Sequence, residues 1–102
     1  MGVPCSLFIT SGAQDTIDGL TAGSLADPKK LRKVNKTLAL LEVGPRHRSP
    51  ASHRYAGLDA EFGQAIWESY VENHTPGAWR VWWFYGIEPQ MISVVRIAAH
   101  PD

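Results

Sequence analysis

The hydrophobic positions of the chain follow a helical period in its first half and an alternating period in its second. Between residues 28 and 43 the apolar side chains recur three or four residues apart, at Leu31, Val34, Leu38 and Leu41. Asp27 is a favourable N-cap, Pro28 suits the first helical turn, and Gly44 ends the pattern. The sequence therefore predicts a helix over residues 28–43, with its lysines on the opposite face.

Two shorter elements precede this helix. Residues 5–10, "CSLFIT", form an apolar and β-branched run, which predicts a first strand. Residues 13–23 place Ile17 and Leu20 on one side of a short helix, although two glycines within the segment disfavour it. We therefore expect one or two helices after the first strand.

Three strand candidates close the chain, at residues 65–73, 79–86 and 90–100. Turn sequences join them, so successive antiparallel pairing is the economical topology. A polar connection over residues 46–64 leads into the first of these strands, with a small turn expected at "YAGL". The prediction is a single α+β domain over residues 1–102, in which a three-stranded meander packs on the helices.

Alternation along these strands separates two kinds of side chain, provided that no bulge intervenes. The odd positions are almost purely apolar, so we expect them against the helices: Trp67, Val71, Val81, Trp83, Tyr85, Val95, Ile97 and Ala99. The even positions mix charged and aromatic residues: Ile66, Glu68, Tyr70, Glu72, Arg80, Trp82, Phe84, Ile92, Val94, Arg96, Ala98 and His100.

The even face carries residue types that together can catalyse the cleavage of RNA. Arg80 suits the negative charge that develops on a phosphate, His100 is a general acid near neutral pH, and Glu68 is a candidate base. The RNA 2′-hydroxyl supplies the nucleophile, and nearby aromatic residues stack on unpaired bases. Two other interpretations remain open. In one, Glu68 forms only a structural cross-strand ion pair with Arg80 or Arg96. In the other, the aromatic residues of this face form an interface with a partner protein.

Composition narrows the possible functions. A hydrophobic content of 44% with four Trp is typical of a folded globular domain. The single Cys5 excludes an intramolecular disulfide, no apolar run is long enough to span a membrane, and no secretory signal is recognisable, which favours the cytoplasm. The histidines lack metal-ligand spacing and there is no phosphate-binding glycine loop, so we expect no metal and no small-molecule cofactor.

Three stretches together resemble the RelE/ParE superfamily of toxin-antitoxin toxins, in its RelE-like branch. They are "KTLALLEVGPRHRSPASHRYAGL", "AIWESYVENHTPGAWRVWWFYG" and "ISVVRIAAHPD". The resemblance covers residues 29–102 and rests on the order and pattern of elements. It implies a small toxin that cuts mRNA in the ribosomal A site, blocks translation and is held inactive by a cognate antitoxin.

The resemblance also implies roles for individual residues. Arg80 falls where such enzymes contact the scissile phosphate, His100 suits the acid near the C-terminus, and Glu68 or Tyr70 assists the 2′-hydroxyl. The lysines typical of the RelE branch are absent from the preceding strand, which leaves the base open. The remaining candidates are expected to bind RNA: Arg46, Arg48, His53, Arg54, Lys29, Lys33 and Trp82.

The charge of the chain supports two alternatives. Formal net charge is zero, whereas such toxins are commonly basic, and affinity for nucleic acid depends on Lys and Arg at phosphates. In the first alternative, the chain is a non-catalytic protein-binding module on the same fold, such as a ParE-like topoisomerase inhibitor or an inactive relative. Alternatively it is a structural domain in which Arg80 and Glu68 pair only with each other.

Overall fold

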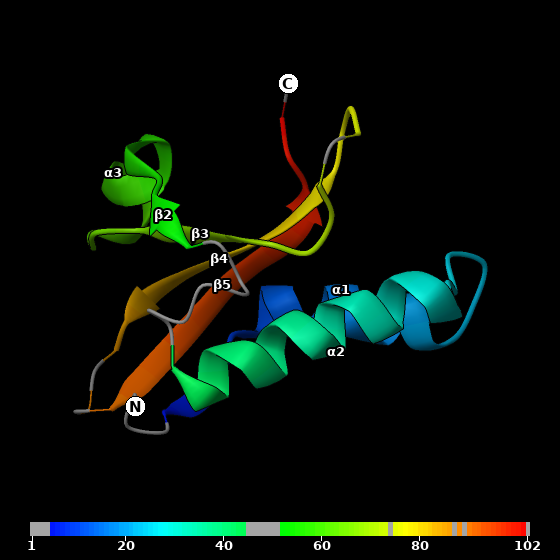
Figure 1. Ribbon diagram of the computed structural model, residues 1–102, viewed down its shortest axis with the longest axis horizontal. Helices are drawn as coiled ribbons and strands as arrows, with labels where there is room; N and C mark the ends of the chain where they lie inside the picture. Colours follow the sequence, from blue (N-terminus) through cyan, green and yellow to red (C-terminus); the bar gives the residue numbers. More distant parts are fainter. Residues whose placement is uncertain (1–4, 45–51, 74, 87, 89, 102) are drawn as a thin grey trace.

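The computed structural model describes residues 5–44, 52–73, 75–86, 88 and 90–101. Its elements are β1 (Ser6–Ile9), α1 (Ser11–Thr21), α2 (Pro28–Val43), β2 (His53–Arg54), the 3₁₀ helix η1 (Ala56–Leu58), α3 (Asp59–Phe62), β3 (Trp67–Tyr70), β4 (Trp79–Tyr85) and β5 (Met91–Ala99). The strands form one sheet in the order β1-β5-β4-β3-β2 (Figure 1). The predicted α+β class is confirmed.

The sheet extends the predicted meander at both edges. Strands β3, β4 and β5 pair antiparallel in succession, as expected. The N-terminal strand β1 lies parallel to β5, with Ser6 opposite Met91 and Ile9 opposite Val94. Within the connection predicted over residues 46–64, His53 and Arg54 form β2 and pair with β3. This connection therefore also carries η1 and α3, and it is not only a polar loop with a small turn.

Both predicted helices are present. Helix α2 has the expected bounds, and Asp27 accepts a hydrogen bond from the Lys30 amide at 3.0 Å as its N-cap. Helix α1 begins at Ser11 after Thr10, whose side chain accepts from the Ala13 amide. Burial of one face of α1 in the core offsets the poor helix propensity of its glycines. No helix in the described part of the chain is long and apolar enough to cross a membrane.

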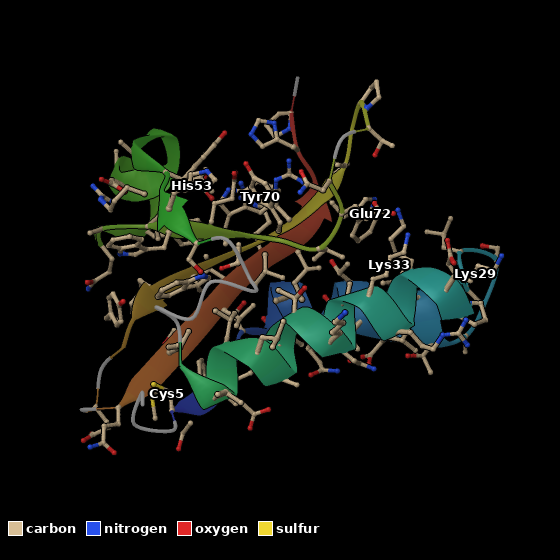
Figure 2. The ribbon with its side chains drawn as sticks, in the orientation of Figure 1. Cys5, Lys29, Lys33, His53, Tyr70 and Glu72 are labelled. Carbon is tan, nitrogen blue, oxygen red and sulfur yellow. The ribbon has the colours of Figure 1, made fainter. Side chains whose placement is uncertain are left out.

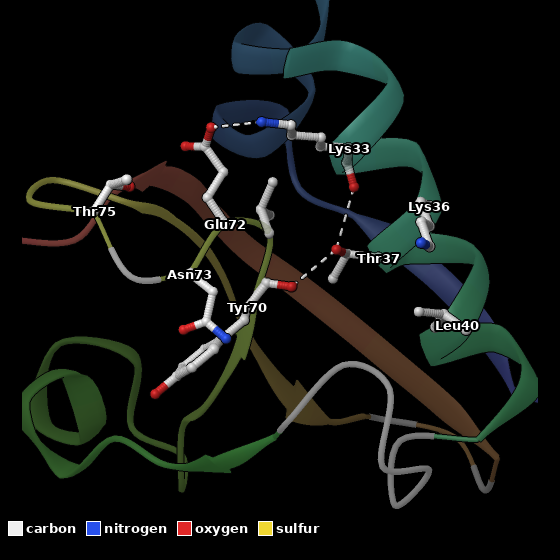
Figure 3. A pocket seen from close by; sticks show the side chains of 9 residues that line it. Lys33, Lys36, Thr37, Leu40, Tyr70, Glu72, Asn73 and Thr75 are labelled. Atoms are coloured by element: carbon white, nitrogen blue, oxygen red, sulfur yellow. Dashed lines mark hydrogen bonds and ion pairs between the residues drawn. The ribbon is translucent and has the colours of Figure 1, made fainter. Parts of the chain in front are cut away.

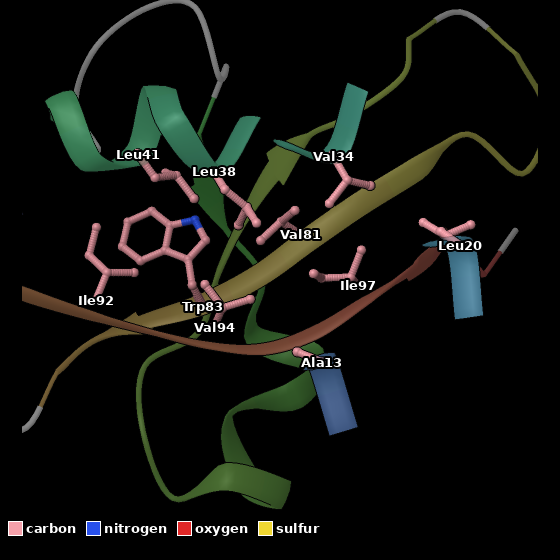
Figure 4. Packing of buried hydrophobic residues seen from close by; sticks show 10 residues of the cluster. All are labelled: Ala13, Leu20, Val34, Leu38, Leu41, Val81, Trp83, Ile92, Val94 and Ile97. Carbon is pink, nitrogen blue, oxygen red and sulfur yellow. The ribbon is translucent and has the colours of Figure 1, made fainter. Parts of the chain in front are cut away.

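The main hydrophobic core lies between the sheet and helices α1 and α2. Its buried members are drawn in Figure 4: Ala13, Leu20, Val34, Leu38, Leu41, Val81, Trp83, Ile92, Val94 and Ile97. The Trp83 indole donates a hydrogen bond to Ser69 Oγ at 2.8 Å, so its polar atom is satisfied within the core. This core fixes β4 and β5 against the two helices.

A β-bulge changes which residues of β5 face this core. Trp82 lies opposite Arg96, but Trp83 lies opposite Val94, so Val95 is the extra residue. The prediction that Ile92 and Val94 share the even face was wrong, because the bulge turns them toward the helices. Val95 lies on the opposite face for the same reason.

A second, smaller core covers part of the other face of the sheet. Ile66, Trp82 and Val95 are buried there, packed against side chains from the segment after β2: Tyr55, Leu58 and Phe62, with Phe84 and Ala98 from the sheet. Figure 1 shows α3 on the side of the sheet away from α1 and α2. The even face is therefore partly covered, and Tyr85, expected in the core, is 47% exposed instead.

Candidate active site

Glu68 is a buried carboxylate on this same face of the sheet, beside the second core. It lies on β3, where the sheet register places His53 of β2 on one side and Trp82 of β4 on the other. The residue is 2% exposed. A buried carboxylate is costly unless cationic or hydrogen-bonding groups face it, so its neighbours determine what the site does.

Three side chains from different parts of the chain face the two oxygens of Glu68. Oε1 lies 2.9 Å from His53 Nε2 and 3.6 Å from Arg80 Nε, while Oε2 lies 3.5 Å from His100 Nε2. Only the first distance lies within hydrogen-bonding range, and the other two are electrostatic contacts. The sheet thus gathers an acid-base set around one carboxylate.

The Arg80 guanidinium is held in one orientation. Its Nη1 donates to the carbonyl oxygens of Glu72 at 2.6 Å and Trp79 at 3.0 Å. Its Cζ lies 3.9 Å from the centroid of the Tyr70 ring, a close cation-π contact. A fixed cation beside the carboxylate stabilises negative charge on a bound phosphate without reorganisation.

Aromatic rings position both histidines. Tyr70 meets His53 edge-on at 5.5 Å, and Tyr55 meets His100 edge-on at 5.9 Å. Trp82 lies behind, 5.8 Å from Tyr55 and stacked near His100 at 6.4 Å. The sequence did not single out Tyr55, although its position two residues after His53 would place both on one face of an extended segment.

Exposure increases outward from Glu68. The side chains of Glu68 and Arg80 are 3% and 12% exposed, whereas those of His100 and His53 are 29% and 47% exposed. The ionic pair therefore forms the floor of the site and the imidazoles form its rim. A bound molecule meets the two rings first.

The structure brings together all four residues predicted to be catalytic, Arg80, His100, Glu68 and Tyr70. It also adds His53, which the sequence placed only among the RNA-binding candidates. The predicted ion pair between Glu68 and Arg80 is present too, but it is one contact of a larger group. Glu68 Oε2 has no hydrogen-bond partner among the described residues, which leaves acceptor capacity in the floor of the site.

The other RNA-binding candidates have different surroundings. Arg54 binds Asp59 through two hydrogen bonds of 3.1 and 2.7 Å; these bonds raise the pKa of Arg54 and lower the pKa of Asp59. Trp82 is 1% exposed because η1 and the segment before it cover it, so it presents no face to a base. Arg46 and Arg48 lie outside the described residues.

The two helix lysines lie away from Glu68. Figure 2 shows Lys29 and Lys33 on α2, on the other side of the sheet from His53. Lys33 Nζ contacts Glu72 at 3.2 Å and Lys30 Nζ contacts it at 2.8 Å. Hydrogen bonding from Lys30, with smaller contributions from the Trp79 amide and Lys33, lowers the pKa of Glu72 to about 2.

A polar cavity of about 430 Å³ lies between α2 and the end of β3 (Figure 3). Lys33, Thr37, Tyr70 and Glu72 are among its lining residues. Thr37 joins the two elements because its hydroxyl lies 3.0 Å from the Tyr70 carbonyl, to which it donates. Within the described residues, no group of three or more His, Cys, Asp or Glu side chains is placed to hold a metal ion.

The fold of the chain was compared with those of known proteins. No family model matches the sequence, and no curated protein matches it. The structure is similar to a YoeB/ParE toxin from Agrobacterium tumefaciens, with a TM-score of 0.70 and 14% identity over 94% of this chain and 99% of that one.

Two further solved structures are similar over nearly the whole chain. A YoeB dimer from Staphylococcus aureus has a TM-score of 0.68 and 10% identity, over 97% of this chain and 100% of the other. An archaeal RelE-RelB complex from Pyrococcus horikoshii OT3 has a TM-score of 0.65 and 11% identity, over 95% and 96%. The chain therefore has the fold of the RelE and YoeB/ParE toxins, as the sequence resemblance implied.

Proposed function

We propose that this protein is the toxin of a toxin-antitoxin system and cleaves mRNA on the ribosome, which blocks translation. The observation that carries the proposal is the acid-base group around Glu68, with His53, Arg80 and His100 all within 3.6 Å of its carboxylate. A domain with only a structural ion pair does not need two partly exposed imidazoles on the same carboxylate. The shared toxin fold supports the same class.

The proposed reaction is attack of the RNA 2′-oxygen on the adjacent phosphorus. The 2′-hydroxyl proton goes to the group centred on Glu68, and His100 donates a proton to the departing 5′-oxygen. Arg80, fixed by two carbonyl oxygens and the Tyr70 ring, stabilises the charge on the phosphate as it becomes five-coordinate. The nucleophile belongs to the substrate, so the protein supplies proton transfer and a fixed cation.

The proposed partners are the ribosome with its mRNA and a cognate antitoxin, all in the cytoplasm. One similar structure is a RelE-RelB complex, which supports a protein partner for this fold. Lys29 and Lys33 on α2 are the described lysines that we assign to contact with RNA phosphates. The reaction needs no small-molecule cofactor in this proposal.

The test is inducible expression in a bacterial host of the wild type, Arg80→Ala and His100→Ala, with mRNA 5′ ends mapped by primer extension. We expect new cuts with the wild type and a decrease of about 10²-fold or more in each variant. Glu61→Gln is a matched control, because Glu61 pairs with Arg96 at the surface, outside the site. Circular dichroism of the purified variants checks that they are folded.

Two results would contradict the proposal. Growth arrest without mRNA cuts would mean that the protein acts as a non-catalytic binding module, such as an inhibitor of a topoisomerase. If folded Arg80→Ala cleaved mRNA as well as the wild type, the guanidinium would have no role in the reaction.

A further inference from the structure

We propose that His53 is the group that takes the 2′-hydroxyl proton, and that Glu68 behind it is a positioning and charge-stabilising residue. This inference rests on the proposed ribonuclease function and assigns its general base. It concerns a residue of the two-residue strand β2, whose partners became apparent only in the folded sheet.

Accessibility favours the imidazole over the carboxylate. The His53 side chain is 47% exposed and that of Glu68 is 3% exposed. A general base must come within hydrogen-bonding distance of the hydroxyl from which it takes the proton. A ribose at the surface of this site reaches His53 directly, whereas it reaches Glu68 only if the rim residues move.

The contact between His53 and Glu68 is the shortest of the three around the carboxylate, at 2.9 Å from Nε2 to Oε1. The two residues are register partners in the β2-β3 pair, so the backbone sets their separation. A buried carboxylate hydrogen-bonded to an imidazole fixes the orientation of the ring and stabilises the imidazolium that forms when the ring takes a proton. Tyr70 packs edge-on against the same ring.

The two histidines face different oxygens of Glu68, with His53 at Oε1 and His100 at Oε2. This arrangement fits a base and an acid on the two sides of one phosphate. As the 2′-oxygen forms its bond to phosphorus, its proton moves to His53; as the bond from phosphorus to the 5′-oxygen breaks, that oxygen takes the His100 proton. The products are a 2′,3′-cyclic phosphate and a free 5′-hydroxyl, and the total charge of the two imidazoles is unchanged.

Among the described residues, charged and titratable groups face His53 or its carboxylate partner from three strands. Glu68 and Tyr70 face it from β3, and Arg80 of β4 and His100 after β5 face the same carboxylate. On its own strand, Arg54 is bound to Asp59. The carboxylate that contacts His53 is therefore shared with one guanidinium and a second imidazole.

The experiment measures single-turnover cleavage of mRNA on purified ribosomes against pH, over about pH 5 to 9, for the wild type and His53→Gln. For the wild type we expect a bell-shaped profile, with a rising limb from deprotonation of His53 and a falling limb from deprotonation of His100. His53→Gln should lose the rising limb and about 10²-fold or more of the rate at the optimum. Asp15→Asn, an exposed change on α1 behind the sheet, is the control.

The possible failures are distinguishable. A folded His53→Gln that keeps the wild-type rising limb would make Glu68 the direct proton acceptor and overturn this inference alone. A wild type that does not cut would overturn the proposed function along with it. In case His53→Gln does not fold, the His53 titration is followed by NMR in the wild type; a pKa more than about one unit from the rising limb would also overturn the assignment.

Discussion

Two adjacent tryptophans of β4 illustrate how single residues divide the molecule into its two faces. Trp83 is buried against α2, and its indole donates to Ser69 at 2.8 Å. Trp82 is buried on the other face under Tyr55, and its indole nitrogen has no hydrogen-bond partner among the described residues. The two rings are equally buried, but only the indole nitrogen of Trp83 has a hydrogen-bond partner among the described residues.

This difference predicts unequal costs for the same substitution. Trp82→Phe and Trp83→Phe both leave a cavity, but only Trp83→Phe also removes a hydrogen bond. We expect Trp83→Phe to lower the free energy of unfolding by about 1 kcal/mol more than Trp82→Phe, measured by urea denaturation. Equal losses, or a larger loss for Trp82→Phe, would contradict the assignment of that hydrogen bond.

Alternation predicted the face of the central site residues correctly from sequence alone. Glu68, Tyr70 and Arg80 lie on strands with a clear period, and their even numbering placed them together before any register was known. His53 was not connected to them, because a two-residue strand carries no period. Its position depends on pairing with β3, which is a property of the folded sheet.

At the scale of elements, Glu72 joins the N-terminal half of α2 to the end of the β3-β4 pair. Its carboxylate binds Lys30 and Lys33 and accepts from the Trp79 amide at 3.1 Å. Its carbonyl oxygen also holds Arg80. One residue thus connects the helix layer to the guanidinium of the site.

The pKa of Glu72 predicts how stability depends on pH. Folding lowers this pKa from 4.5 to about 2, so the ionised carboxylate stabilises the folded state at neutral pH. That contribution is present above about pH 4.5 and is lost as pH falls toward about 2. We expect the stability difference between the wild type and Glu72→Gln to shrink over this window, measured by thermal unfolding. Glu42→Gln, an exposed substitution on α2, is the control, and a constant difference for Glu72→Gln would refute the linkage.

Local signals explain which elements the sequence predicted well. The bounds of α2 followed from its cap, proline and terminal glycine, which act within a few residues. The bulge had no such signal, because Val94 and Val95 are both valines and either fits either face. Likewise, η1 and α3 are too short to show a hydrophobic period in the sequence. Their apolar residues are explained by the folded sheet, where they pack on the face that carries Trp82.

At the scale of the whole molecule, most described cations are already paired with carboxylates. Lys30, Lys33, Arg54, Arg80 and Arg96 each contact Glu or Asp. Lys29, Arg32 and Lys36 form no ion pair with a carboxylate in the described part of the chain. Few cations are therefore available to replace counterions on RNA, in keeping with the zero net charge.

This pairing predicts a shallow salt dependence for the proposed binding to the ribosome. Four phosphate contacts, from the three unpaired cations and the exposed Lys33, give a slope of log K against log salt of roughly −4, and two more from Arg46 and Arg48 give roughly −5. We expect a slope within this range between about 50 and 200 mM salt, measured by filter binding. A steeper slope would mean that Lys30 also leaves Glu72 on binding.

The order of strands has a consequence for how the protein is made. Strand β5 is the last element of the chain, yet it lies inside the sheet, with β1 on one side and β4 on the other. The pairing of Ser6 with Met91 must wait until β5 has been synthesised. His100 follows β5 and also completes the cluster around Glu68. The sheet therefore closes, and the group around Glu68 is completed, only after β5 and His100 have emerged from the ribosome, so the candidate site is among the last parts of the fold to form.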